Sequence, residues 1–158
     1  MAARILEGKV FAQQFKEDAG RRAVVLRDTY GVVPGLAVII VGSNPASQVY
    51  VRNKHKSCEE LGIYSEVIEL PEDTAKEALI ARIDELNGNK RIHGILVQLP
   101  LPRQIAAYEA EILNRIDPAK DVDGFHPVNV GRLVTGEPGL VPCTPAGCIR
   151  MLELADIP

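Results

Sequence analysis

The sequence has few aromatic residues and no tryptophan, since four tyrosines and three phenylalanines are all that occur among its 158 residues. It has no apolar run as long as a membrane span, and residues 1–7 lack the apolar core of a secretory signal. The net charge is −3, with 18 basic residues scattered along the chain. Neither a membrane nor a nucleic acid is therefore expected as a partner, and the predicted location is the cytoplasm.

Cysteines are also few, and no C-x-x-C pair occurs among Cys58, Cys143 and Cys148. This excludes a disulfide framework and a zinc site, so we expect reduced thiols in or near the core. The acidic segment around Asp121 and Asp123 lacks the third ligand before Gly124, and the distal glutamate, of a calcium-binding loop. No metal site is predicted.

The pattern of apolar residues predicts alternating strands and helices. Strands are expected at residues 36–41, 65–70 and 92–99, and helices at 9–30, 45–61 and about 74–87, the last capped by Asp73 or Thr74. The first helix carries a rough apolar stripe through Val10, Phe15 and Val24. Such alternation predicts one α/β domain of βαβ units, with a mostly parallel sheet and helices on both faces. The very apolar strand 92–99 is expected in the middle of the sheet, and residues 118–145 as a loop.

A Tyr-x-x-x-Lys pair, Tyr50 and Lys54, lies on the second predicted helix, just after a strand and a Gly/Ser/Asn/Pro turn. Four residues along a helix bring both side chains to one face, where a phenol and an ammonium can share a hydrogen bond and a substrate. Gln98 ends another predicted strand. Because open parallel sheets bind ligands beyond the carboxyl ends of their strands, these side chains are expected to converge on one cleft.

Four segments together resemble the bifunctional methylenetetrahydrofolate dehydrogenase/cyclohydrolase family. Their sequences are PASQVYVRNK at residues 45–54, GILVQLPLP at 94–102, PAKDVDGF at 118–125 and PCTPAG at 142–147. Their order and intervals match as well, and the resemblance covers nearly the whole chain. It implies interconversion of 5,10-methylene-, 5,10-methenyl- and 10-formyl-tetrahydrofolate, with NADP, or NAD in some members, as cofactor.

The resemblance also implies roles for individual residues. Lys54 would be the principal catalytic residue, Tyr50 would stack on the folate, Gln98 would hydrogen-bond to Lys54, and Asp121 would grip the polar edge of the pterin. The predicted catalytic set is therefore Lys54, Tyr50, Gln98 and Asp121, and the predicted substrate contacts are Tyr50, Ser47, Val97, Gln98, Leu99, Asp121 and Cys143. A site of this kind needs water activation and proton transfer more than it needs a metal.

In domain terms, residues 1–140 resemble the folate-binding catalytic domain, and residues 141–158 the start of the connecting helix to an NAD(P)-binding domain. No G-x-G-x-x-G pattern follows a predicted strand, so no cofactor-binding residues are predicted in this chain. The same absence argues against a short-chain dehydrogenase, which shares the Tyr-x-x-x-Lys pair. The chain is therefore expected to be the catalytic half of a homodimeric enzyme and to lack dehydrogenase activity by itself. The alternative is a non-catalytic folate-binding or assembly fragment.

Overall fold

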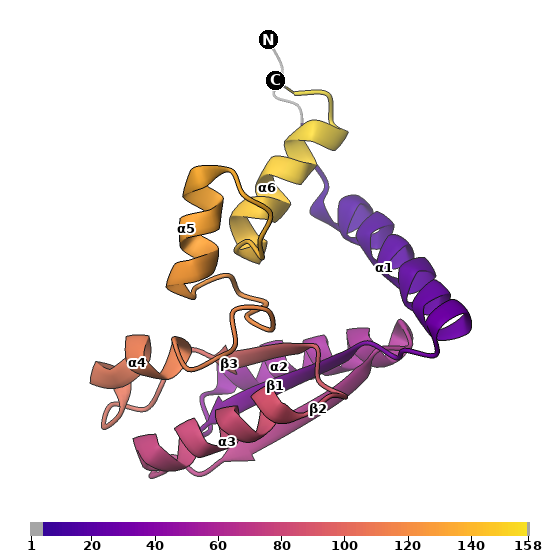
Figure 1. Cartoon of the computed structure of the whole chain (residues 1–158). Coiled ribbons are helices and arrows are strands. Elements are labelled where there is room, and N and C mark those ends of the chain that lie inside the picture. The colour runs from indigo at the N-terminus through magenta and orange to yellow at the C-terminus, as the bar shows by residue number, and fades with distance from the viewer. Residues whose placement is uncertain (1–4, 158) are drawn as a thin grey trace.

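The computed structural model describes residues 5–157 and shows an α/β fold built on a parallel sheet (Figure 1). Three strands pair in the order β2-β1-β3. The sheet and its two covering helices consist of β1 (Gly35–Val41), α2 (Pro45–Glu60), β2 (Tyr64–Leu70), α3 (Lys76–Gly88) and β3 (Gly94–Gln98). The α/β class, the parallel pairing and the helices on both faces are as the sequence predicts.

The central strand β1 supplies side chains to two hydrophobic layers. Val38 and Ile40 pack with Val51 of α2, whereas Ala37 and Ile39 belong to a larger cluster with Leu79 and other residues of α3. Successive side chains of a strand point to opposite faces, so a strand covered on both faces must be apolar at every position. This explains the unbroken apolar sequence of β1.

The expected central position of the strand at residues 92–99 is wrong. Among the described strands, β3 pairs only with β1 and lies last in the order β2-β1-β3. Its outer side is covered instead by residues 120–122, where Ile95 N donates to Lys120 O at 2.7 Å and Ile95 forms a parallel bridge with Asp121. A Cβ at Gly94 would lie 2.5 Å from a methyl carbon of Val122, so only glycine allows this segment to come so close. An apolar strand therefore indicates burial, but not which neighbours provide it.

The start of α2 follows the sequence closely. Asn44 precedes the helix and its side chain accepts a hydrogen bond from Ser47 N at 3.1 Å, while Pro45 occupies the first turn. The predicted cap of α3 is wrong: the residue before this helix is Ala75, and the Thr74 hydroxyl donates to Pro71 O instead. The turn before α3 is thus closed by Thr74 without capping the helix.

The predicted loop at residues 118–145 contains a helix, α5 (Pro127–Thr135), and the start of another, α6 (Cys143–Leu154). His126 caps α5, because its Nδ1 accepts from Val128 N at 3.1 Å, and Gly136 ends the helix with φ of 74°. The glycine and proline residues that suggested a loop are the start and stop signals of these short helices. A short 3-10 turn, η1 (Ala106–Tyr108), and the helix α4 (Glu109–Leu113) follow β3.

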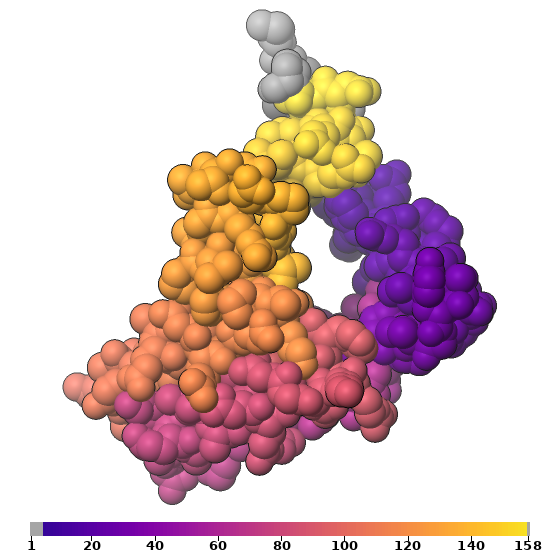
Figure 2. Space-filling model, in the orientation of Figure 1, coloured from indigo at the N-terminus to yellow at the C-terminus, as the bar shows by residue number. Residues whose placement is uncertain are grey.

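The first helix, α1 (Gly8–Tyr30), has the predicted extent, but its apolar stripe is not buried. Among its residues only Ala23 is buried, whereas Val10 is 52% and Val25 is 55% exposed. In Figure 2 an opening lies between α1 and the part of the chain that carries α5 and α6, so this side of α1 is uncovered. No described helix is long and apolar enough to cross a membrane.

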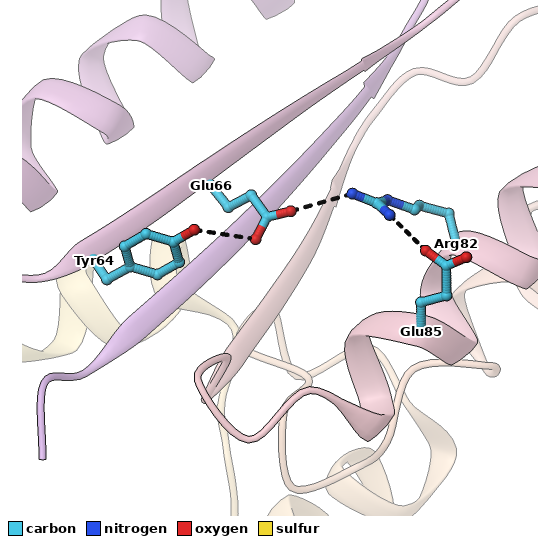
Figure 3. Close-up of polar contacts among 4 residues, drawn as sticks. All are labelled: Tyr64, Glu66, Arg82 and Glu85. Atoms are coloured by element: carbon cyan, nitrogen blue, oxygen red, sulfur yellow. Dashed lines mark hydrogen bonds and ion pairs between the residues drawn. The ribbon is translucent and has the colours of Figure 1, made fainter.

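The outer strand β2 carries a chain of polar contacts toward α3 (Figure 3). Tyr64 donates to Glu66, Glu66 pairs with Arg82 at 3.2 Å, and Arg82 also pairs with Glu85. These pairs are partly exposed, so each contributes at most about 1 kcal/mol to stability. Charged side chains along an edge strand discourage pairing with another chain, which fits a strand whose outer edge is uncovered among the described residues.

Candidate active site

The predicted catalytic pair meets Gln98 at the carboxyl end of the sheet. The Lys54 amine donates to Gln98 Oε1 at 2.7 Å, and it lies 5.9 Å from the centroid of the Tyr50 ring. Tyr50 and Lys54 occupy one face of α2, and Gln98 is the last residue of β3. The predicted convergence of these three residues and the predicted Lys54–Gln98 hydrogen bond are confirmed.

A second set of bonds fixes the Gln98 amide. Its Nε2 donates to Leu99 O at 2.9 Å, so its oxygen is turned toward Lys54. An ammonium group only donates, and the carbonyl oxygen is the part of an amide that can accept from it. The Ser47 hydroxyl donates to the same Leu99 carbonyl at 3.3 Å. The first turn of α2 and the end of β3 are therefore joined at the site.

The predicted substrate contacts differ in accessibility. Val97 is 2% exposed, and its side chain belongs to the large hydrophobic cluster. Ser47 is also buried, whereas Leu99 is half-buried and packs on the same cluster. Tyr50, in contrast, is 62% exposed. A ligand at this edge can therefore reach the ring of Tyr50 directly, while the side chain of Val97 supports the site from below.

Asp121 is not in the open part of the site. It is 2% exposed, and its Oδ2 accepts from His126 N and from the Asn129 side chain, both at 2.9 Å. These bonds hold the turn after the β3 edge, and a ligand would have to replace them to bind this oxygen. Contact between Asp121 and a ligand therefore stays a prediction.

Asp123 is a second carboxylate, which the sequence reasoning did not assign to the site. It is half-buried, and burial raises its pKa, whereas the nearby charge of Lys54 lowers it and that of Asp121 raises it. Asp123 is thus close enough to Lys54 for their charges to interact. The Asp-x-Asp spacing before Gly124 was the signal in the sequence, but this spacing alone does not tell which of the two carboxylates is available to a ligand.

Cys143, at the start of α6, is close enough to Asp123 and Lys54 for their charges to act on its thiol, and its contact with a substrate stays a prediction. Its Sγ lies 3.6 Å from Val122 O, and partial burial raises the pKa of the thiol, with Asp123 raising it further and Lys54 lowering it. The thiol is therefore protonated at neutral pH and is not an activated nucleophile. The expectation that all cysteines lie in or near the core holds for buried Cys58, but Cys143 and Cys148 are exposed.

The other two histidines considered, besides the His126 cap, have structural roles or lie on another surface. His93 accepts from Gly35 N at 3.1 Å, which ties the start of β1 to the turn before β3. His55 lies 3.0 Å from the Ser65 hydroxyl, toward β2 and away from Gln98.

The candidate site combines the amine of Lys54, the fixed amide of Gln98, the carboxylate of Asp123 and the exposed ring of Tyr50. Such a set can hold a flat polar ring and transfer a proton.

Comparison with known proteins places this arrangement in a family. The profile of the "Tetrahydrofolate dehydrogenase/cyclohydrolase, catalytic domain" matches residues 6–123. A bifunctional protein FolD from Methanosarcina mazei is 52% identical over 156 residues, which are 99% of this chain and 54% of that protein. The chain thus spans about half the length of the curated relatives it matches.

Solved structures agree. The bifunctional FolD enzyme of Campylobacter jejuni superimposes with a TM-score of 0.94 at 46% identity, over 99% of this chain and 55% of that one. The FolD enzyme of Trypanosoma brucei, solved with NADP and an inhibitor, gives 0.92 at 34% identity, over 99% and 54%. With the family profile covering most of the chain, this protein belongs to the tetrahydrofolate dehydrogenase/cyclohydrolase family and corresponds to its catalytic domain.

Proposed function

We propose that this chain binds tetrahydrofolate derivatives and that Lys54 is the proton-transferring residue in the hydrolysis of 5,10-methenyl- to 10-formyl-tetrahydrofolate. The 2.7 Å hydrogen bond between the Lys54 amine and Gln98 is the observation that carries this proposal. A methenyl carbon already carries positive charge, so its hydrolysis needs an activated water and a proton acceptor. In its neutral form the Lys54 amine, held by Gln98, can accept the proton that water loses as it adds to this carbon and return it to the nitrogen released when the C–N bond breaks.

The remaining roles follow from the positions of the side chains. The 62% exposed ring of Tyr50 stacks on the folate, and Gln98 orients the amine of Lys54. The polar edge of a pterin offers adjacent N–H donors, which a carboxylate matches well. The charge of Lys54 acts on half-buried Asp123, whereas Asp121 is already bonded to His126 and Asn129, so we assign the pterin contact to Asp123 and keep Asp121 as the second candidate.

The dehydrogenase step belongs to the whole protein. It would oxidise 5,10-methylene-tetrahydrofolate by hydride transfer to NADP, which the Trypanosoma brucei relative binds. We also propose that the whole protein is a cytoplasmic homodimer, as the family resemblance implies. The part assigned to the present chain is the folate site and its proton-transfer group.

Matched amide variants of the two aspartates test the folate site. Binding of 5,10-methenyl-tetrahydrofolate is measured by calorimetry for Asp123→Asn and Asp121→Asn, together with their melting temperatures. Asp123→Asn should weaken binding about 10- to 100-fold without lowering the melting temperature, because one charge-assisted contact is lost. Asp121→Asn should instead lower the melting temperature. The reverse pattern would assign the pterin contact to Asp121.

The alternative is a non-catalytic folate-binding module. The exposure of Tyr50 and of Cys143 favours it, because a site so open gives poor control over substrate position and water. Incubating the chain with methenyl-tetrahydrofolate separates the two functions. Binding with no conversion above the uncatalysed rate would support the module, and conversion that disappears in Lys54→Ala would support the enzyme.

A further inference from the structure

The turn that carries Asp123 is held by a polar cluster, named the latch, which consists of half-buried Lys120 and of the buried residues Asp121 and Asn129. At one end, the Lys120 ammonium donates to three backbone carbonyls, those of Leu86, Asn87 and Asn89, at 3.0, 2.8 and 2.9 Å. These carbonyls lie at the carboxyl end of α3, where a helix favours positive charge. Lys120 therefore uses all its donors to anchor the segment to α3.

At the other end, Asn129 of α5 holds Asp121. Its Nδ2 donates to Pro118 O at 2.8 Å and to Asp121 Oδ2 at 2.9 Å. The same Asp121 oxygen accepts from His126 N, and Asp121 O accepts from Gly124 N at 3.1 Å. Asp123 sits between these bonds, so both sides of its turn are fixed.

Asn129 places a polar side chain in the interior at a cost in stability. It is 1% exposed, and its Oδ1 has no hydrogen-bond partner among the described residues. A buried polar atom left unpaired lowers stability, so such a group in a folded protein calls for an explanation. The two bonds donated by its Nδ2 supply one, because the bond to Asp121 holds the start of the turn and the bond to Pro118 holds the segment that leads to it.

We propose that Lys120 and Asn129 are positioning residues, which act through the latch to hold the turn of residues 121–124 and thereby fix the position of the Asp123 carboxylate in the candidate site. The inference rests on the proposed function, since Asp123 is the proposed pterin contact. Catalytic geometry is sensitive to displacements of about 1 Å, which can lower a rate by roughly 100-fold. A latch that ties the turn to both α3 and α5 limits such displacements.

The test uses the isotope-labelled 158-residue chain without any ligand. Lys120→Met and Asn129→Ala each remove one end of the latch, and Lys90→Met makes the same change at an exposed lysine near the end of α3. Circular dichroism checks folding, and Lys120→Gln serves as a milder variant if Lys120→Met does not fold. NMR follows the titration of the Asp123 carboxyl and the hydrogen exchange of the Gly124 and His126 amides.

Both latch variants should make these two amides exchange about tenfold faster or more, because the bonds to Asp121 loosen. The titration midpoint of Asp123 should fall toward that of an exposed aspartate, because burial is the largest influence on it and the charges of Lys54 and Asp121 act against one another, while the Cys143 thiol stays uncharged in this pH range. Lys90→Met should change neither. An unchanged Asp123 titration in a folded latch variant would overturn the inference. Failure of the parent chain to bind folate would refute the proposed function alone, since these readouts need no ligand.

Discussion

Replacing Lys54 with alanine tests the central part of the proposed mechanism. The change removes the amine and its 2.7 Å bond to Gln98 but leaves the stacking surface of Tyr50 and the carboxylate of Asp123. A hydrogen bond to a charged group contributes about 1.5–3 kcal/mol, and the half-buried position of Lys54 favours the lower end. The variant should therefore stay folded and bind folate within about tenfold of the parent.

The effect on turnover should be much larger. A positioned acid or base accelerates a reaction by about 10²- to 10⁴-fold, which at 1.36 kcal/mol per factor of ten raises the barrier by roughly 2.7–5.4 kcal/mol. Substrate binding and proton transfer are thus expected to separate in this one variant. A loss in kcat with little change in substrate affinity is the signature of an interaction made in the transition state.

The assay uses a chimera in which this chain replaces the corresponding half of the Methanosarcina mazei relative, so that the whole length of the family is present. Hydrolysis of methenyl-tetrahydrofolate is followed spectrophotometrically, and binding by calorimetry. Lys56→Ala is the matched control, because Lys56 lies on the same helix with its side chain 76% exposed. Turnover by Lys54→Ala within about threefold of the parent, or an equal loss in Lys56→Ala, would refute the role given to Lys54.

Three further results are expected. Ile39→Ala should lower the free energy of unfolding by about 2–5 kcal/mol in urea titrations, because Ile39 is fully buried, whereas Val134→Ala, at an 81% exposed position, should change it by no more than about 0.5 kcal/mol. Burial raises the pKa of Asp123 in the folded chain above its value in the unfolded chain. The contribution of Asp123 to the free energy of unfolding is therefore complete below the unfolded pKa and is lost as the pH rises through the folded pKa. Asp123→Asn should therefore melt at a higher temperature than the parent at pH 7 but not at about pH 3, where both states are protonated. Calorimetry should detect no NADP binding to the 158-residue chain, because it has no Gly-rich strand-to-helix turn for a pyrophosphate; saturable, tight binding would contradict this.

Much of the fold was predictable because local patterns and long-range packing agree in β1 and α2. β1 is apolar at every position, and α2 has Pro45 in its first turn after the capping Asn44. Strand order was not predictable in the same way. The apolar composition of β3 indicates that the strand is buried. Its edge is covered by residues 120–122, about 25 positions later in the chain, and the only sign of this contact in the sequence of β3 is Gly94.

The site was predictable where it depends on helical spacing. Tyr50 and Lys54 lie on one face of α2 by geometry alone, the end of a predicted strand placed Gln98 near them, and the resemblance supplied the hydrogen bond between Gln98 and Lys54. The two aspartates show the limit, because the Asp-x-Asp pattern is symmetric in chemical terms. Their environments differ because His126 and Asn129 bind buried Asp121, whereas Asp123 is half-buried and within reach of the charge of Lys54. These contacts depend on α5, a helix that the glycine and proline content concealed.

The pairing of Ile40 with Gln98 connects the chemistry to the register of the sheet. α2 begins at Pro45, shortly after β1 ends at Val41, so the place of Lys54 is counted from β1, whereas that of Gln98 is counted from β3. A slip of one residue would move one strand by about 3.3 Å past the other and turn its side chains to the opposite faces. That shift exceeds the 2.7 Å length of the Lys54–Gln98 bond. The hydrogen bond between Lys54 and Gln98 therefore forms only when β1 and β3 pair in the correct register. A chain with the wrong register would lose both its two hydrophobic layers and its proton-transfer geometry.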